Sequence, residues 1–582
     1  MNMPKKMQLW VIVASLLFLF FFVNYERIMT WIGKDVISVS VKSEEVLSEL
    51  VEGKEEIAGD SDSLRFDENM IAYDEATNTI LIPQNMSDDY WKGQLKLLTN
   101  SGEICFAEDD LWKNKSEAIR SGHAFALYHI KEKEYSMFRV VFTGMPIMNL
   151  CTTEQIGAEE DRTWSGNVMV YDQYRTAERI QHAECQYRVR GGSSREREKS
   201  SYKLELTDKK LSFLGLRKDE DWILNALYDD TGLIHNKLSY SVWQEIAAYN
   251  QVPNDEGISI EYIEVFRDNE YLGVYALTER IDRKTLSMDK NDILYKCRAD
   301  RIPEEHNYTN EDTDDLRPIF ILKYPKEPEE KDWEPLKDWV NYYCKEQFET
   351  YEEGAALLNM ENAIDYNLFT LLIGGYDNIR KNVFLIAEYQ QDGSYVFKKV
   401  PWDLNSTWGN PWVSFEPYSI TDNSTWCTDI STLYFYDETK VADLLRVRWK
   451  ELRDAGVITK EKIYEMLNAE YSYLHDSGAY RRNYEKWPYM AEEWNDECVY
   501  EFVDGRIDFL DTYFEQLYTD TVSEAVYDGV DYADEFDVRY YWLKNYETLS
   551  AIYPYDRNLL LEHYVLYGKP YGLQGRKTNE PR

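Results

Sequence analysis

The chain has 582 residues, of which 44% are hydrophobic and 15% aromatic. This composition excludes a chain that is disordered throughout, and the length predicts roughly three or four domains. The formal charge of -41 excludes nucleic acid as a partner, because the phosphates would be repelled; it favours a basic macromolecular partner, or serves solubility alone.

Residues 7–23 form an almost unbroken apolar run, and Lys5 and Lys6 precede it. A run of this length, with basic residues before it, predicts a single-pass transmembrane anchor over residues 1–34. The bulk of the chain would then lie outside the cytoplasm, on a bacterial surface or on the mother-cell face of a spore coat. Residues 35–66 read as an acidic stalk.

Short alternating runs separated by turn residues predict a small all-β domain over residues 67–153. Residues 154–520 are mixed, and residues 527–577 form a Tyr- and Asp-rich tail that we interpret as a small helical module. The predicted fold class is therefore multidomain: a small all-β domain, an α+β domain and a small α module. The seven cysteines show no C-x-x-C, which excludes the usual zinc and thioredoxin-like sites.

The mixed domain has a recognisable order of elements. Two strands are expected around a Gly-Ser-rich loop, followed by a helix, a hairpin, an acidic insertion and several helices. In chain order these are strands 187–190 and 201–206, helix 232–248, hairpin strands 258–266 and 271–277, insertion 303–315, and helices 331–349, 360–373, 439–455, 460–475 and 503–517.

The most informative motif begins at Asp377 and continues to Asn382, in the pattern D-x-x-x-x-N. Two β-like runs follow, residues 383–389 and 395–400, and Asp403 comes just after the second. Protein kinases use this order for the catalytic base, a metal-binding amide and a metal-binding aspartate. The alternative is structural: Asp377 would cap a turn and Asp403 a strand end.

Several short sequence motifs resemble those of one family. They are Arg-Gly-Gly-Ser-Ser from Arg190, Ser-Tyr-Lys-Leu-Glu-Leu from Ser201, Glu-Tyr-Leu-Gly-Val-Tyr from Glu270, Glu-Arg-Ile-Asp from Glu279, and Pro-Trp-Asp-Leu-Asn-Ser-Thr-Trp-Gly from Pro401, besides the Asp377 motif. Together, over residues 140–515, they are similar to the spore coat protein H family, the CotH kinase-like proteins. The resemblance implies an atypical protein-kinase fold and transfer of the ATP γ-phosphate to Ser or Thr of another protein.

The resemblance also implies roles for single residues. Lys203 would pair with the ATP phosphates; the alternative is a solvated lysine on a strand face. Asp377 would be the catalytic carboxylate. Asn382 and Asp403 would bind Mg²⁺ or Mn²⁺. Asn405 stands where the family commonly has a second aspartate. This change would remove one negative charge near the metals and lower metal affinity, or Asn405 is only a turn residue.

Four further residues are expected to bind the nucleotide. Arg190, Ser193 and Ser194 lie in a loop that could cover phosphates, although a simple strand turn fits as well. Glu279 would contact adenine or form a salt bridge with Arg283. The acidic partner of Lys203 stays open between two residues, Glu245 and Asp230.

Two other functions remain open at this stage. The chain could be a non-catalytic surface-binding or spore-surface protein that uses a kinase-like scaffold, or the loop from Asp403 to Asn405 could bind Ca²⁺ without a nucleotide. For the kinase, the excess of 106 acidic over 65 basic residues predicts a basic, Ser-rich protein substrate. The tail resembles a short helical module of bacterial surface proteins.

Overall fold

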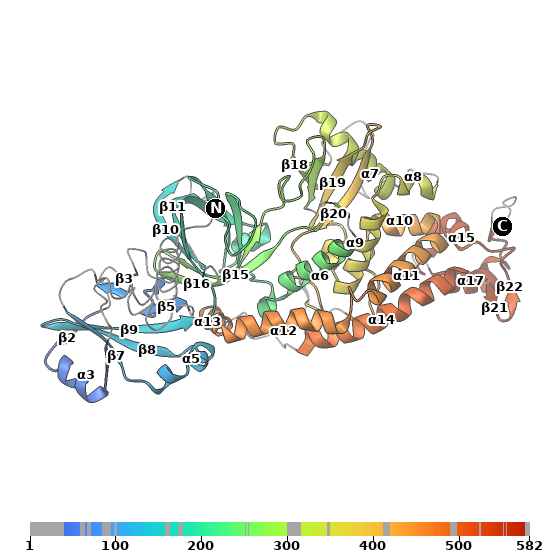
Figure 1. Cartoon of the computed structure of the whole chain (residues 1–582). Helices are drawn as coiled ribbons and strands as arrows, with labels where there is room; N and C mark the ends of the chain where they lie inside the picture. Colours follow the sequence, from blue (N-terminus) through green and yellow to red (C-terminus); the bar gives the residue numbers. More distant parts are fainter. Residues whose placement is uncertain are drawn as a thin grey trace, which may run out of the picture. The chain divides into compact units, whose positions relative to one another are not determined.

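The computed structural model describes residues 40–58, 64–66, 72–83, 95–97, 102–156, 163–172, 179–250, 252–253, 255–298, 316–345, 350–410, 419–488, 497–522, 525–550, 552–554 and 556–576. The chain divides into two units, each built from separate stretches of sequence. Figure 1 labels helices and strands of the chain and colours them by residue number. The first unit comprises Met1–Ala226, Tyr262–Leu277 and Ser472–Pro488. The second comprises Leu227–Glu261, Thr278–Tyr471 and Tyr489–Arg582. We describe each unit by itself.

A seven-stranded sheet opens the first unit. Its order is β1-β7-β8-β9-β5-β4, and β2 pairs with β9. Two short helices belong to this part, α3 (Glu44–Val51) and α5 (Lys115–Ser121), and β3 and β6 form a separate pair. The strands are β1 (Ser40–Lys42), β2 (Glu55–Glu56), β3 (Leu64–Phe66), β4 (Ala72–Asp74), β5 (Thr79–Pro83), β6 (Leu95–Leu97), β7 (Glu103–Ala107), β8 (Ala124–Ile130) and β9 (Glu134–Thr143).

A closed barrel follows, with the strand order β10-β11-β12-β13-β14-β16-β15. Its closure depends on a parallel pairing of β10 with β15, in which Ile147 lies opposite Glu264. The predicted boundary between residues 153 and 154 falls inside β10. The strands are β10 (Ile147–Ile156), β11 (Thr163–Tyr171), β12 (Ile180–Arg190), β13 (Ser201–Leu206), β14 (Asp221–Asn225), β15 (Ile260–Arg267) and β16 (Glu270–Glu279).

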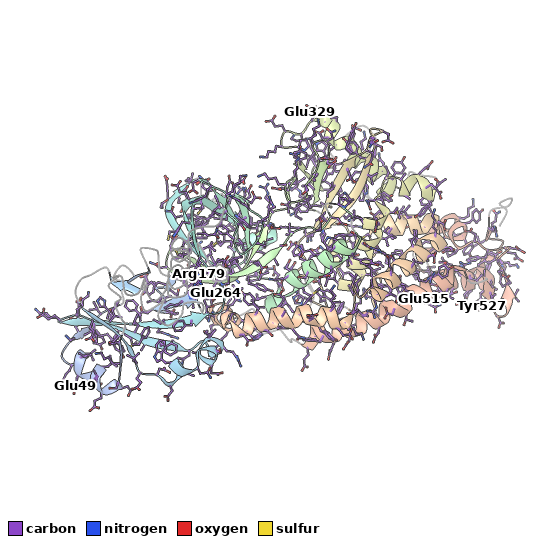
Figure 2. The ribbon with its side chains drawn as sticks, in the orientation of Figure 1. Glu49, Arg179, Glu264, Glu329, Glu515 and Tyr527 are labelled. Atoms are coloured by element: carbon purple, nitrogen blue, oxygen red, sulfur yellow. The ribbon has the colours of Figure 1, made fainter. Side chains whose placement is uncertain are left out.

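A buried ion pair joins three elements of the first unit. Arg482, from α13 (Ala479–Lys486), donates to both carboxylate oxygens of Glu264 on β15, at 2.8 and 2.9 Å (Glu264 is labelled in Figure 2). Its guanidinium also donates to Thr143 Oγ1 at the end of β9, at 2.6 Å. Glu264 is fully buried, so this pairing compensates a carboxylate that water does not reach.

The second unit contains a four-stranded sheet of order β18-β17-β19-β20 and most of the helices. The strands are β17 (Ile293–Cys297), β18 (Phe320–Tyr324), β19 (Val383–Tyr389) and β20 (Tyr395–Pro401). The helices that begin in this unit before residue 523 are η5 (Thr231–Leu233), α6 (His235–Asn250), η6 (Glu330–Trp333), α7 (Glu334–Lys345), α8 (Tyr351–Ala355), α9 (Met360–Ile373), η7 (Tyr376–Asn378), α10 (Thr428–Tyr436), α11 (Glu438–Asp454), α12 (Lys460–Asp476) and α14 (Glu497–Val522).

The C-terminal residues pack around an aromatic core of their own, which includes Phe536, Tyr541 and Tyr564. The elements there are β21 (Val526–Tyr527), β22 (Val530–Asp531), α15 (Val538–Lys544), α16 (Tyr546–Leu549), α17 (Arg557–His563) and the π-helical turn η9 (Tyr564–Gly568). The described residues thus combine several sheets with many helices, which agrees with the predicted α+β class. The individual domain boundaries stay predictions.

The predicted localisation needs correction. Among the residues that the structure describes, no helix has both the length and the apolar character that a membrane crossing requires. This finding overturns the prediction of a single-pass transmembrane protein. The apolar run 7–23, the predicted stalk up to residue 39 and the acidic insertion 303–315 lie outside the described residues.

Candidate active site

The carboxylate of Asp377 lies at the centre of the site. It follows α9, which ends at Gly374 in the left-handed conformation (φ 64°) that glycine adopts without strain. One oxygen of Asp377 accepts a hydrogen bond from Asn382 Nδ2 at 2.7 Å, and the other pairs with Lys381 Nζ at 2.7 Å. The structure therefore brings together two of the predicted site residues, Asp377 and Asn382, and adds a lysine.

A buried amide, that of Asn378, holds this loop against the hairpin. Its Nδ2 donates to the carbonyl oxygens of Trp402 at 2.9 Å and of Asn382 at 3.3 Å. Tyr366 of α9 donates to the carbonyl oxygen of Asn378 at 3.1 Å. Burial raises the pKa of Tyr366 well above its ordinary value, so the hydroxyl stays protonated and remains a donor.

Asp403 lies two residues after the end of β20, and β20 pairs with the strand that begins next to Asn382. Val383 lies opposite Pro401 in the β19–β20 register, and Trp402 N donates to Asn382 O at 2.9 Å. Asn382 (φ 53°) and Asp403 (φ 59°) both have left-handed backbones. Asn and Asp tolerate this conformation better than other non-glycine residues. The hairpin thus places the two predicted metal ligands at the same end of a strand pair.

The donor set fits a hard divalent cation. With its Nδ2 on Asp377, Asn382 has its amide oxygen available as a ligand, and Asp403 contributes a half-buried carboxylate. Within the described residues, no three or more His, Cys, Asp or Glu side chains are grouped so that they could hold a metal ion. Mg²⁺ is commonly bound by one or two carboxylates together with substrate phosphates, and this pair of residues suits that arrangement.

Lys203, in the other unit, lies on the outer face of the barrel. Its neighbours Tyr202 and Leu204 point into the barrel core, so the alternation along β13 turns Lys203 outward. Its ammonium pairs with Glu205 Oε2 at 2.8 Å and Asp221 Oδ1 at 2.9 Å.

Both acids considered as the partner of Lys203 belong to the second unit and have partners there. Glu245 pairs with Lys462 at 2.5 Å, in the second unit. Asp230 accepts hydrogen bonds from His235 and Asn236. The acids that do contact Lys203 come from its own strand and from β14. Glu205, two residues along the same strand, shares the face of Lys203, whereas sequence spacing could not reveal Asp221.

The loop after β12 contains the remaining phosphate-binding candidates of the first unit. Arg190 ends β12, and Ser193 and Ser194 lie in the turn η4 (Ser193–Glu196). Gly191 has φ 129°, and a Cβ placed on it would lie 2.2 Å from Ser194 Oγ. Only glycine is compatible with this backbone, as expected for the simple strand turn that was the alternative interpretation of the loop. A phosphate-binding role of the loop stays a prediction.

Glu279 ends β16 and belongs to the second unit. Its Oε2 accepts a hydrogen bond from Ser259 N at 3.0 Å, which ties the carboxylate to the neighbouring chain segment. Arg283, its suggested salt-bridge partner, donates to Met288 O at 3.1 Å and lies over the ring of Tyr324. The adenine contact of Glu279 remains a prediction.

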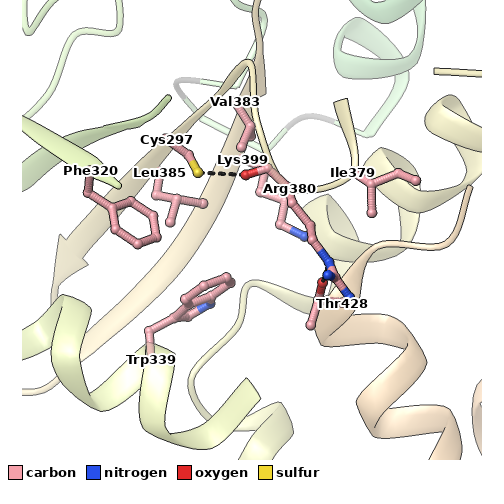
Figure 3. A pocket seen from close by; sticks show the side chains of 9 residues that line it. All are labelled: Cys297, Phe320, Trp339, Ile379, Arg380, Val383, Leu385, Lys399 and Thr428. Carbon is pink, nitrogen blue, oxygen red and sulfur yellow. Dashed lines mark hydrogen bonds between the residues drawn. The ribbon is translucent and has the colours of Figure 1, made fainter. Parts of the chain in front are cut away.

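A small pocket lies against the Asp377–Asn382 loop (Figure 3). Two of the residues that line the pocket, Ile379 and Arg380, belong to this loop. Cys297 Sγ donates to Arg380 O at 2.5 Å, and Lys399 pairs with the buried Asp429 at 2.6 Å. The full lining is Cys297, Phe320, Trp339, Ile379, Arg380, Val383, Leu385, Lys399 and Thr428.

Sequence reasoning missed two residues of the site. Lys381 lies one position before Asn382. The prediction used only the first and last residues of the D-x-x-x-x-N motif, so it did not include this lysine. Asn378 follows Asp377 directly, and nothing in the local pattern shows that it is fully buried. A lysine four residues after the candidate base was a usable signal; the burial of Asn378 was not.

Comparison with known proteins places the chain in a family. No curated protein matches it. A family model described as CotH kinase protein matches residues 187–515, more than half of the chain. The matched segment contains every predicted site residue, from Arg190 to Asp403. Kinases in general use ATP and a divalent metal ion. Because the matching family model covers more than half of the chain, the chain belongs to the CotH kinase family.

Proposed function

We propose that this protein is a protein kinase that transfers the γ-phosphoryl group of ATP to a Ser or Thr hydroxyl of another protein. One observation supports this most strongly: Asn382 and Lys381 each hold Asp377 at 2.7 Å, beside the β19–β20 hairpin, and Asp403 follows two residues after that hairpin ends. A base and two oxygen ligands for a metal are what phosphoryl transfer requires from the protein.

The proposed reaction assigns one task to each side chain. Asp377 accepts the proton of the substrate hydroxyl while that oxygen attacks the γ-phosphorus. The bond between the γ-phosphorus and its bridging oxygen breaks, and ADP leaves with the electron pair. Asn382 orients Asp377 through its N–H group, and Lys381 balances its negative charge.

Asn382 and Asp403 would hold Mg²⁺ or Mn²⁺. When bound, this ion neutralises charge that develops on the phosphates. The roles of Lys203, Arg190, Ser193 and Ser194 toward the phosphates, and of Glu279 toward adenine, rest on the family resemblance.

A basic, Ser-rich protein is the substrate class that the charge supports. The chain has a formal charge of -41, so its field attracts segments rich in Lys and Arg. Such attraction raises the rate of encounter and weakens as salt is added, because the Debye length is about 10 Å at 0.1 M.

Calorimetric titration with ATP tests the proposal, in the presence of Mn²⁺ or Mg²⁺ and after chelation of metal. We expect heat of nucleotide binding only with metal, and its loss in Asp403→Asn, a substitution that keeps the size and the backbone tolerance of the residue. A wild-type protein that shows no nucleotide binding with either metal would contradict the kinase and favour a non-catalytic scaffold.

A further inference from the structure

Helix α6 presents a polar face that is buried. Asn236, Ser239 and Tyr240 are spaced i, i+3 and i+4, so they lie on one side of the helix. Their exposed fractions are 2%, 0% and 5%. The inward side of a helix is usually apolar, and buried polar groups there need specific hydrogen-bond partners.

The partner of this face is the loop that carries Asp403. Tyr240 Oη accepts a hydrogen bond from Asp403 N at 3.1 Å, and Asn236 Oδ1 accepts one from Leu404 N at 2.9 Å. Ser239 Oγ accepts one from Trp408 Nε1 at 2.9 Å. Side chains of α6 therefore bind the backbone of the proposed metal ligand and of the residue after it.

The backbone of Asp403 needs such support. Its φ of 59° is left-handed, a conformation that residues with a side chain adopt only rarely. A backbone of this kind persists where the surroundings determine it. Hydrogen bonds on two consecutive N–H groups, at Asp403 and Leu404, fix the peptide from which the carboxylate projects.

Asn236 is itself fixed by a buried carboxylate. Asp230 Oδ2 accepts from Asn236 N and from Asn236 Nδ2, both at 2.9 Å. Its other oxygen accepts from His235 N at 2.9 Å and His235 Nδ1 at 2.8 Å. With Nδ2 held in this way, the amide oxygen of Asn236 is turned toward Leu404.

We propose that Tyr240 and Asn236 are positioning residues of α6 that set the orientation of the Asp403 carboxylate for the divalent cation. This inference rests on the proposed function, because it takes Asp403 as a metal ligand. The helix does not touch the cation in this scheme; it acts through the backbone of Asp403 and Leu404.

Tyr240→Phe is the sharpest test, because it removes one hydroxyl and keeps the ring. The matched control is Tyr295→Phe, which removes a buried hydroxyl that donates to Asp332 O at 2.5 Å, elsewhere in the same unit. Mn²⁺ affinity is measured by electron paramagnetic resonance of the free ion, with and without a non-hydrolysable ATP analogue. Thermal unfolding is followed in parallel.

We expect Tyr240→Phe to bind Mn²⁺ about tenfold more weakly, as the loss of one positioned hydrogen bond allows. Its midpoint of unfolding should fall no further than that of Tyr295→Phe, and the control should bind Mn²⁺ like the wild type. Asn236→Ala, which removes the acceptor of the Leu404 N–H group, should weaken Mn²⁺ binding in the same direction.

Two results would overturn the inference, and they differ. If the wild type binds Mn²⁺ and Tyr240→Phe binds it equally well, the positioning role falls while the proposed function stands. If the wild type binds no Mn²⁺, even with the nucleotide analogue, the metal assignment of Asp403 fails and the inference falls with it.

Discussion

Replacement of Asp377 by Asn removes a single charge at the centre of the site. The Asn side chain has nearly the same size, and its oxygen can still accept the hydrogen bond from Asn382 Nδ2 that measures 2.7 Å in the structure. What it cannot do is take up the proton of a substrate hydroxyl. Loss of a general base typically slows a reaction about 10²–10⁴-fold, equivalent to about 2.7–5.5 kcal/mol in the barrier.

The same substitution should also lower the stability of the fold. It breaks the ion pair with Lys381, whose side chain is 17% exposed against 11% for Asp377. A hydrogen bond between charged groups contributes about 1.5–3 kcal/mol, which sets the expected loss of stability. ATP affinity should stay nearly constant, because Asp377 acts on the substrate hydroxyl.

The assay is the initial rate of phosphate transfer at saturating ATP, with ATP affinity and urea unfolding measured on the same samples. Glu388→Gln is the matched control: it removes a carboxylate that pairs with Lys398 at 3.1 Å on the same hairpin. A wild-type rate in Asp377→Asn would refute the assignment of the base. An equal rate loss in Glu388→Gln would refute it too, since a general loss of charge would then be the cause.

Three further predictions concern stability, pH and substrate. Arg482→Met should lower the free energy of unfolding by about 3–5 kcal/mol, because it leaves the fully buried Glu264 unpaired; a loss below about 1 kcal/mol in urea unfolding would contradict this. Burial raises the pKa of Asp255 from 3.8 to about 6, so the folded protein binds this proton more tightly and stability falls as pH rises from about 4 to 6. This decline amounts to at most about 3 kcal/mol, and Asp255→Asn should remove it; an unchanged pH profile of unfolding would show that Asp255 is not responsible. Ser peptides flanked by Lys should be phosphorylated faster than Glu-flanked ones at low salt, with the difference shrinking as salt rises; equal rates at low salt would leave the charge a solubility feature.

Local patterns predicted the elements around the site well. Helix α9 covers the predicted residues 360–373, because Asn359 caps its first turn and Gly374 ends it. Strand β19 also coincides with the prediction, at residues 383–389. The D-x-x-x-x-N motif could be interpreted for the same reason: its residues are close in sequence and adjoin regular elements.

Long-range pairing was beyond local patterns. The barrel closes by pairing β10 with β15, more than a hundred residues later, and no periodicity carries that information. Strand β12 begins at Ile180, seven residues before the predicted start. Its buried positions there include Gln181 and Ala183, residue types that do not favour strands.

The residues that hold the Asp403 loop could not be predicted from the sequence for a related reason. Asn236 and Tyr240 reach the Asp403 loop across more than 160 residues of sequence. On the sequence, nothing in helix 232–248 indicated that Asn236 and Tyr240 would be buried. The structure shows that these residues are buried, and only the partner loop explains why.

The central claim is that the protein transfers the γ-phosphoryl group of ATP. The most direct measurement compares ATP labelled at the γ-phosphate with ATP labelled at the α-phosphate, each incubated with the full chain, Mn²⁺ or Mg²⁺ and a basic Ser-rich protein. Our account predicts label on Ser or Thr from γ-labelled ATP only, and labelling that is slower by about 10²-fold or more after Asp377→Asn. Protein label from α-labelled ATP would mean transfer of the nucleotide, and no label from either would mean no transfer; both results would contradict the account.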